Sequence, residues 1–76
     1  MPTLKAFRDC RISMYPRDHA PPHVHVEFRD GDRCTVEIRF LRVRGSVHPT
    51  RKLAPALAWI EARRELLLDR WKEIVR

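Results

Sequence analysis

The sequence predicts a small α+β domain: a three- to four-stranded antiparallel sheet with one long C-terminal amphipathic helix packed on one face. Two patterns predict this class. Apolar and polar residues alternate through residues 10–47, and apolar residues recur at helical spacing through residues 50–75. A chain of 76 residues supports one hydrophobic core, so we expect a single domain over residues 1–76. Because so small a core is marginally stable, a homodimer or a bound partner is also expected.

Three segments show the period-two alternation of half-buried antiparallel strands, namely residues 10–15, 23–29 and 33–40. Residues 41–47 could hold a short fourth strand, with Gly45 as a bulge or a turn. The apolar side of the predicted sheet is formed by Cys10, Ile12, Met14, Val24, Val26, Phe28, Cys34, Val36, Ile38 and Phe40. The two cysteines therefore lie on the core side, and they do not form a disulfide framework.

The register of the central hairpin follows from its turn. A two-residue loop at Asp30-Gly31 would mix polar and apolar residues on each face, so we prefer the three-residue loop Asp30-Gly31-Asp32. On the apolar side, this register pairs Val26 with Val36 and Phe28 with Cys34. On the polar side, it pairs His25 with Glu37, Glu27 with Thr35, and His23 with Arg39. A carboxylate opposite His25 would orient the imidazole and raise its basicity.

The predicted helix covers residues 53–75. Its apolar face is formed by Leu53, Leu57, Ile60, Leu67, Trp71 and Ile74. Pro49 and Thr50 are suitable start signals, but Pro55 would remove a helical hydrogen bond, so the helix either begins near Pro55 or kinks there. Arg64 lies within the apolar arc. Its guanidinium either reaches solvent over a buried stem or pairs with a carboxylate that ties helix to sheet.

The chain is strongly basic, with sixteen Lys and Arg against ten Asp and Glu, a net charge of +6. Most of these cations are arginines, whose planar guanidinium matches phosphate or carboxylate. This charge favours RNA, DNA or an acidic protein as a partner, although it also serves solubility. The candidate phosphate-binding residues are Arg11, Arg17, Arg39, Arg42 and Arg44. With no membrane-spanning stretch and no secretory signal in the sequence, we expect a cytoplasmic protein.

Three of the four histidines, His19, His23 and His25, lie within seven residues in a proline-stiffened segment. His23 and His25 share one side of a strand, so they could bind one divalent metal ion. His19, Glu27 or Asp18 would be the third ligand.

Metal-free acid–base chemistry is a second interpretation of the cluster. His23, His25 and Tyr15 would then be the catalytic residues for cleaving RNA or a phosphate ester, among the arginines at positions 11, 17 and 39. In a third, purely structural interpretation the cluster only shapes a turn and a solvated sheet face. The residues expected to support the site are Asp18, Glu37 and Arg64.

One further pattern covers nearly the whole chain. It consists of Met1-Pro2-Thr3, then Met14-Tyr15-x-x-Asp18-His19-x-Pro21-Pro22-His23-x-His25-Val26, then Trp59, Arg64-Glu65 and Leu67-Leu68 to Trp71. In these residues the sequence resembles the bacterial domain of unknown function numbered four-one-six-zero. Pro55 and the basic stretch Arg42-Val43-Arg44 depart from the pattern of that family.

The resemblance implies a small stand-alone protein that is often encoded beside a partner of the family numbered two-four-four-two. Such pairs are regarded as toxin–antitoxin-like or regulatory modules, and no activity comes with the resemblance. We therefore expect a component of a two-gene module that binds nucleic acid or its cognate partner through the basic, histidine-bearing sheet face. The alternatives are a small ribonuclease or phosphoesterase, metal-dependent or metal-free, and a protein-interaction subunit without a ligand site.

Overall fold

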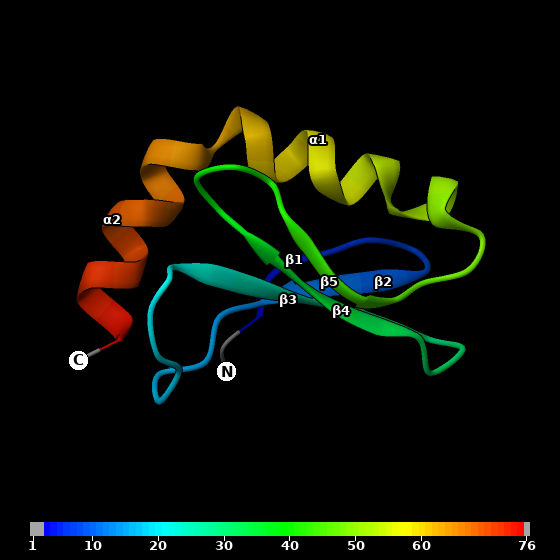
Figure 1. Cartoon of the computed structure of the whole chain (residues 1–76), viewed down its shortest axis with the longest axis horizontal. Helices are drawn as coiled ribbons and strands as arrows, with labels where there is room; N and C mark the ends of the chain where they lie inside the picture. The colour runs from blue at the N-terminus through cyan, green and yellow to red at the C-terminus, as the bar shows by residue number, and fades with distance from the viewer. Residues whose placement is uncertain (1–2, 76) are drawn as a thin grey trace.

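Five antiparallel strands form one sheet in the order β1-β2-β3-β4-β5, so every strand pairs with its neighbour in sequence. The computed structural model describes residues 3–75. Its elements are β1 (Thr3–Ala6), β2 (Cys10–Ser13), β3 (His23–Phe28), β4 (Arg33–Glu37), β5 (Val43–Ser46), the 3-10 helix η1 (Thr50–Leu53), α1 (Ala54–Ala62) and α2 (Arg64–Ile74). Figure 1 shows α1 along one side of the sheet and α2 turning down past its end. The predicted α+β class is confirmed, but the sheet has more strands and the C-terminal region has two helices.

The predicted faces of the sheet are confirmed. Alternate side chains of β3 and β4 are buried, because successive residues of a strand point to opposite faces. In β2, Cys10 and Ile12 are buried on the apolar side, and Ser13 is buried as well. The core contains Cys10, Ile12, Met14, Val24, Val26, Phe28, Cys34, Val36 and Ile38 from the sheet region, with Val47, Leu53, Ala56, Ile60, Leu67 and Trp71 above them. Both cysteines are buried and free, and burial raises the pKa of each thiol. Phe40, predicted on the apolar side, lies instead in the turn after β4 and is 68% exposed.

The register predicted for the β3–β4 hairpin is wrong by two residues, since each β3 residue lies opposite the β4 residue two positions before the predicted one. His23 lies opposite Glu37 and His25 lies opposite Thr35. The turn is centred one residue earlier than predicted, because the Phe28 amide donates to the Asp32 carbonyl and Gly31 takes a φ of +99°. Glycine accepts this left-handed conformation without strain. The loop still has three residues, so the polar and apolar faces are preserved although the cross-strand partners move.

The two edge strands differ from the prediction in different ways. β1 was not predicted, since its four residues are only half-buried or exposed and show no clear alternation. β5 lies within the predicted fourth strand, where Gly45 has a φ of +116°. A Cβ at this position would lie 2.9 Å from the Arg33 carbonyl oxygen, so only glycine allows this close approach of β5 to β4.

The predicted single helix is interrupted at Arg63, whose φ of −122° and ψ of 24° are not helical. A straight helix over residues 53–75 would be about 34 Å long, whereas the longest strand, with six residues, spans only about 20 Å. The break lets α2 turn and bury Leu67 and Trp71 at the end of the sheet. Pro55 lies in the first turn of α1, where its missing N–H removes no hydrogen bond.

Candidate functional site

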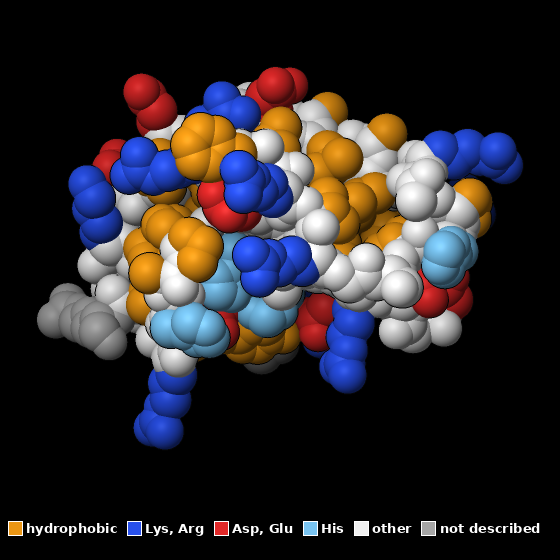
Figure 2. All heavy atoms as spheres, viewed as in Figure 1, with side chains coloured by type: hydrophobic (Ala, Val, Ile, Leu, Met, Phe, Trp, Pro, Cys, Tyr) orange, Lys and Arg blue, Asp and Glu red, His pale blue; other side chains and the backbone are white. Residues whose placement is uncertain are grey.

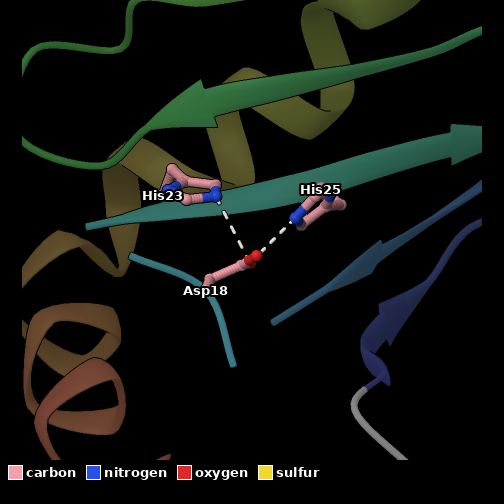
Figure 3. A group of neighbouring side chains, drawn as sticks. All are labelled: Asp18, His23 and His25. Carbon is pink, nitrogen blue, oxygen red and sulfur yellow. Dashed lines mark hydrogen bonds and ion pairs between the residues drawn. The ribbon is translucent and has the colours of Figure 1, made fainter. Parts of the chain in front are cut away.

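The polar face of the sheet brings two of the predicted histidines together with an aspartate. The His25 Nε2 atom lies 2.9 Å from Asp18 Oδ2, and the His23 Nε2 atom lies 3.3 Å from the same oxygen (Figure 3). All three side chains are partly buried, with exposed fractions of 15% for His23, 21% for Asp18 and 27% for His25. We call these three residues the Asp18 cluster.

Two structural elements position the Asp18 cluster. His23 and His25 are separated by one residue on β3, so their imidazoles project from the same face of the sheet. Asp18 belongs to the loop that connects β2 to β3, where its amide donates to the Tyr15 carbonyl in a turn. This loop brings the carboxylate back under both rings, as Figure 3 shows.

The orientation of His23 is set by two contacts. Its Nδ1 atom lies 2.8 Å from the Pro21 carbonyl oxygen, which can only accept, so Nδ1 carries the proton. Its ring also lies 5.3 Å from the Trp71 ring, centroid to centroid, at the point where α2 passes the end of the sheet. The loop and α2 therefore fix the ring with Nε2 directed at Asp18.

A pocket of about 310 Å³ opens beside the cluster. It is lined by Asp18, His19, Ala20, Pro21, His23, His25, Thr35, Glu37, Arg42 and Arg44. The lining thus combines imidazoles and carboxylates with two arginines from the β4–β5 region. Figure 2 shows histidine side chains gathered in a group on the visible surface, with Lys and Arg side chains directly beside them.

Tyr15 and Glu27 form a second group next to the cluster. The Tyr15 hydroxyl donates to Glu27 Oε1 at 2.9 Å, and the Arg11 Nε atom donates to the same oxygen at 3.2 Å. Burial and the bond to Glu27 raise the pKa of Tyr15, so it remains a proton donor near neutral pH. Burial alone would raise the pKa of Glu27, but the bonds from Tyr15 and Arg11 outweigh it and lower that pKa. Glu27 therefore already has its partners and is less suited to metal binding than Asp18.

Several predicted residues lie outside this arrangement. His19 lines the pocket but is exposed, and its ring centroid lies 6.4 Å from that of His23. The Tyr15 ring lies nearly perpendicular to the His25 ring, with the centroids 4.7 Å apart, and its hydroxyl is bonded to Glu27. Glu37 lies opposite His23 rather than His25, and Asp18 takes the orienting role expected of it. Arg64 ties helix to sheet through a backbone carbonyl instead of a carboxylate, since its Nε atom donates to Ile38 at 3.1 Å.

The predicted phosphate-binding arginines do not all reach the pocket. Arg42 and Arg44 line the pocket, whereas Arg11 is paired with Glu27. Arg17 is exposed in the β2–β3 loop, and Arg39 lines a separate depression beside Trp71 and Lys72.

Sequence reasoning missed two contributors to this face. Arg33 lies opposite Glu27 on β4 and borders a depression that it shares with His25 and Arg44. Its two-residue spacing from Thr35 was the available signal. Trp71, predicted only as an apolar residue of the helix, contacts His23 as well as the core. No sequence signal predicted that contact, because it depends on the helix break at Arg63.

These features define a small domain in which a meander sheet, backed by two helices, carries a His/Asp cluster on its polar face. The chain belongs to the DUF4160 family, a domain of unknown function, whose family model matches residues 10–72. That match includes the whole Asp18 cluster and Trp71 and leaves out β1. The comparisons with curated proteins and with solved structures found no match. In residues 3–75, no helix combines the length and apolarity needed to cross a membrane.

Proposed function

We propose that this protein binds nucleic acid through the polar face of its sheet, as the cytoplasmic component of a two-gene toxin–antitoxin-like or regulatory module. The observation that supports the proposal most directly is the position of Arg42 and Arg44, which line the pocket beside His23 and His25. Guanidinium groups are well suited to phosphate oxygens, because their planar set of N–H donors matches the geometry of these acceptors.

The charge distribution also supports this proposal. Arg33 and Arg44 lie on the polar face of the neighbouring strands β4 and β5, and Arg42 directly precedes β5. All three are exposed, and none forms an ion pair within residues 3–75. A row of free arginines at an exposed sheet edge is suited to following a phosphate backbone.

Salt-dependent binding tests the proposal. The affinities of labelled single-stranded RNA and duplex DNA are measured by fluorescence anisotropy from 50 to 200 mM salt. We expect the R42Q/R44Q variant to bind RNA more weakly, with the slope of log K against log salt reduced by about 1.4. The matched control is R51Q/R70Q, which removes the same charge from η1 and α2. Equal weakening by both variants, or no binding by wild type at low salt, would refute a specific nucleic-acid face.

The two-gene context needs its own test. We propose that the cognate small protein encoded beside this one binds the same arginine-bearing edge and competes with nucleic acid. Co-purification of the two proteins, followed by an anisotropy competition, measures this. If the pair forms and RNA remains bound with unchanged affinity, the shared surface is excluded.

Phosphodiester cleavage is the second candidate, and the contact between His25 and Asp18 favours it. A carboxylate 2.9 Å from an imidazole orients the ring for general acid–base catalysis. The same labelled RNA, analysed for cleavage products, separates the candidates. Products that H25A abolishes and R70Q leaves unchanged would establish a ribonuclease, whereas intact RNA in the bound state supports binding alone.

A further inference from the structure

We propose that Asp18, His23 and His25 form a binding site for a divalent transition-metal ion of the zinc class. One candidate ligand atom from each residue lies within 4.8 Å of the other two. Zinc binds imidazole nitrogen and carboxylate oxygen at 2.0–2.2 Å, so two ligand atoms of a tetrahedral site are about 3.3 Å apart. Of the two contacts from Asp18 Oδ2, the one to His23 Nε2 equals this separation at 3.3 Å, and the one to His25 Nε2 is somewhat shorter at 2.9 Å.

The protonation pattern of His23 is the second observation. Because Nδ1 donates to the Pro21 carbonyl, the neutral ring has a bare lone pair on Nε2. That lone pair faces the carboxylate oxygen of Asp18 at 3.3 Å. Two acceptors at this distance repel each other unless a cation or a proton lies between them. Metal-binding histidines have this arrangement, with one nitrogen donating to a carbonyl and the other facing the ion.

Within residues 3–75, no Lys or Arg forms an ion pair with Asp18, although Arg42 and Arg44 line the adjoining pocket. Glu27 is paired with Arg11, and Lys52 is paired with Asp30 and Asp32. Across residues 3–75, Asp18 forms ion pairs only with the two imidazoles. A bound metal ion would supply the missing positive charge.

The donor set decides the class of ion. Two imidazoles and one carboxylate suit zinc, iron, cobalt or nickel, whereas magnesium and calcium prefer oxygen ligands alone. Three protein ligands leave further coordination positions for water or another ligand. The adjoining pocket gives these positions access to solvent. This inference is independent of the proposed nucleic-acid binding, since the metal ligands and the arginines are different side chains.

Calorimetric titration of the chelator-treated full chain with Zn²⁺ tests the site. We expect one equivalent to bind, and D18N or H25A to weaken the affinity by about 100-fold or more, beyond the usual loss for residues that only support a ligand. The matched control is H48A, which removes an exposed histidine beside the cluster of Asp30, Asp32 and Lys52 at the β3–β4 turn and should leave the affinity unchanged. Mg²⁺ should give no saturable binding. A wild-type protein that does not bind Zn²⁺, or variants that bind it as tightly as wild type, would overturn the proposal.

Cobalt provides a readout that does not depend on variant stability. Co²⁺ bound to the wild type should show visible absorption bands of four- or five-coordinate geometry, which Zn²⁺ then displaces. Zn²⁺ at about 100 times its Kd should also raise the unfolding temperature of the wild type by about 10 °C or more. The circular dichroism of D18N shows whether that variant is folded. A six-coordinate aqueous cobalt spectrum, or no thermal shift, would contradict the site.

Discussion

The two ends of the β3–β4 hairpin carry carboxylates in opposite electrostatic situations. At the turn, Lys52 Nζ lies 2.7 Å from Asp30 Oδ2 and 2.8 Å from Asp32 Oδ2. Near the other end, the carboxylate of Asp18 in the β2–β3 loop forms ion pairs only with His23 and His25 among the residues that the structure describes. The turn and the loop that holds Asp18 lie at opposite ends of the sheet in Figure 1.

The difference separates a structural cluster from a candidate binding site. Lys52 also lies over the Phe28 ring at 4.7 Å, and the His48 amide donates to Asp32. We call Asp30, Asp32 and Lys52 the turn cluster, in which every charged group is paired with another member. The Asp18 cluster adjoins a pocket, and its imidazoles can change protonation or bind a ligand. Whether the charged groups of a cluster are already paired with one another is thus a better guide to function than the number of charged residues in it.

Replacing Trp71 should give the largest effect and act mainly at the Asp18 end. Trp71 is 8% exposed and contacts both the core and His23. We expect Trp71→Ala to lower the free energy of unfolding by about 3–5 kcal/mol, as measured by urea denaturation. Because this loss could unfold a 76-residue domain, Trp71→Phe is the companion variant. In the NMR spectrum of this variant, the His23 imidazole signals should shift and the Lys52 signals should stay in place. Equal shifts of both sets of signals would show that the two ends of the hairpin are not independent.

Replacing Lys52 should act at the opposite end. Lys52→Met leaves Asp30 and Asp32 facing each other without a cation, so the unfolding temperature should fall. The hydrogen bonds from Lys52 lower the pKa of both aspartates below the ordinary value of 3.8. A carboxyl group whose pKa is lowered by folding stabilises the folded state fully at pH values above its ordinary pKa. This stabilisation is lost as the pH falls through the lower pKa of the folded state. The difference between wild type and variant should therefore narrow below about pH 3.8.

The stability difference between wild type and Lys52→Met at high pH provides a further check on the turn cluster. Hydrogen bonds from both aspartates raise the pKa of Lys52 above 10.5, so its contribution is complete below 10.5 and is lost as pH rises through the raised value. Lys72→Met, on the exposed face of α2, is the control and should change the unfolding temperature much less. A pH-independent difference between wild type and Lys52→Met would exclude the ion pairs as its cause.

The faces of the sheet were predictable, but the edges and the helix break were not. Alternation at positions such as Val24, His25 and Val26 assigns each side chain to a face, whatever the exact register. A register shift of two residues, being even, therefore kept His23 and His25 on the polar side while changing their partners. No Pro or Gly near Arg63 indicates a helix break in the sequence. The break depends instead on how the helix fits over the end of the sheet.

The candidate site was predictable only where strands hold it. His23 and His25 follow from their spacing on β3, and Arg44 lies on β5 within the predicted fourth strand. Asp18 was one of several candidates for a third ligand, because the path of a loop decides which residue returns to the strand. Its place beside both rings depends on the turn at Tyr15 and on the carbonyl of Pro21.

Variants that affect Glu27 should have the smallest effect on stability, but they test the comparison most directly. Glu27 lies beside the Asp18 cluster and yet, like the carboxylates of the turn cluster, has its own partners. Tyr15→Phe removes one hydrogen bond to Glu27 and should cost about 1 kcal/mol in urea denaturation. The chain has a single tyrosine, so its ultraviolet titration reports Tyr15 alone. Burial and Glu27 raise the pKa of Tyr15 above 10.0, so the stabilisation is complete below 10.0 and is lost as pH rises through the raised value.

The variant Glu27→Gln should lower the pKa of Tyr15 toward 10.0, because it removes the negative charge that opposes ionisation of the phenol. It should leave the Zn²⁺ affinity nearly unchanged, since Arg11 and Tyr15 already occupy Glu27 Oε1. An unchanged tyrosine titration would show that burial alone raises this pKa. A large loss of Zn²⁺ affinity would instead place Glu27 among the metal ligands and remove the distinction between a complete carboxylate group and an open one on the same sheet face.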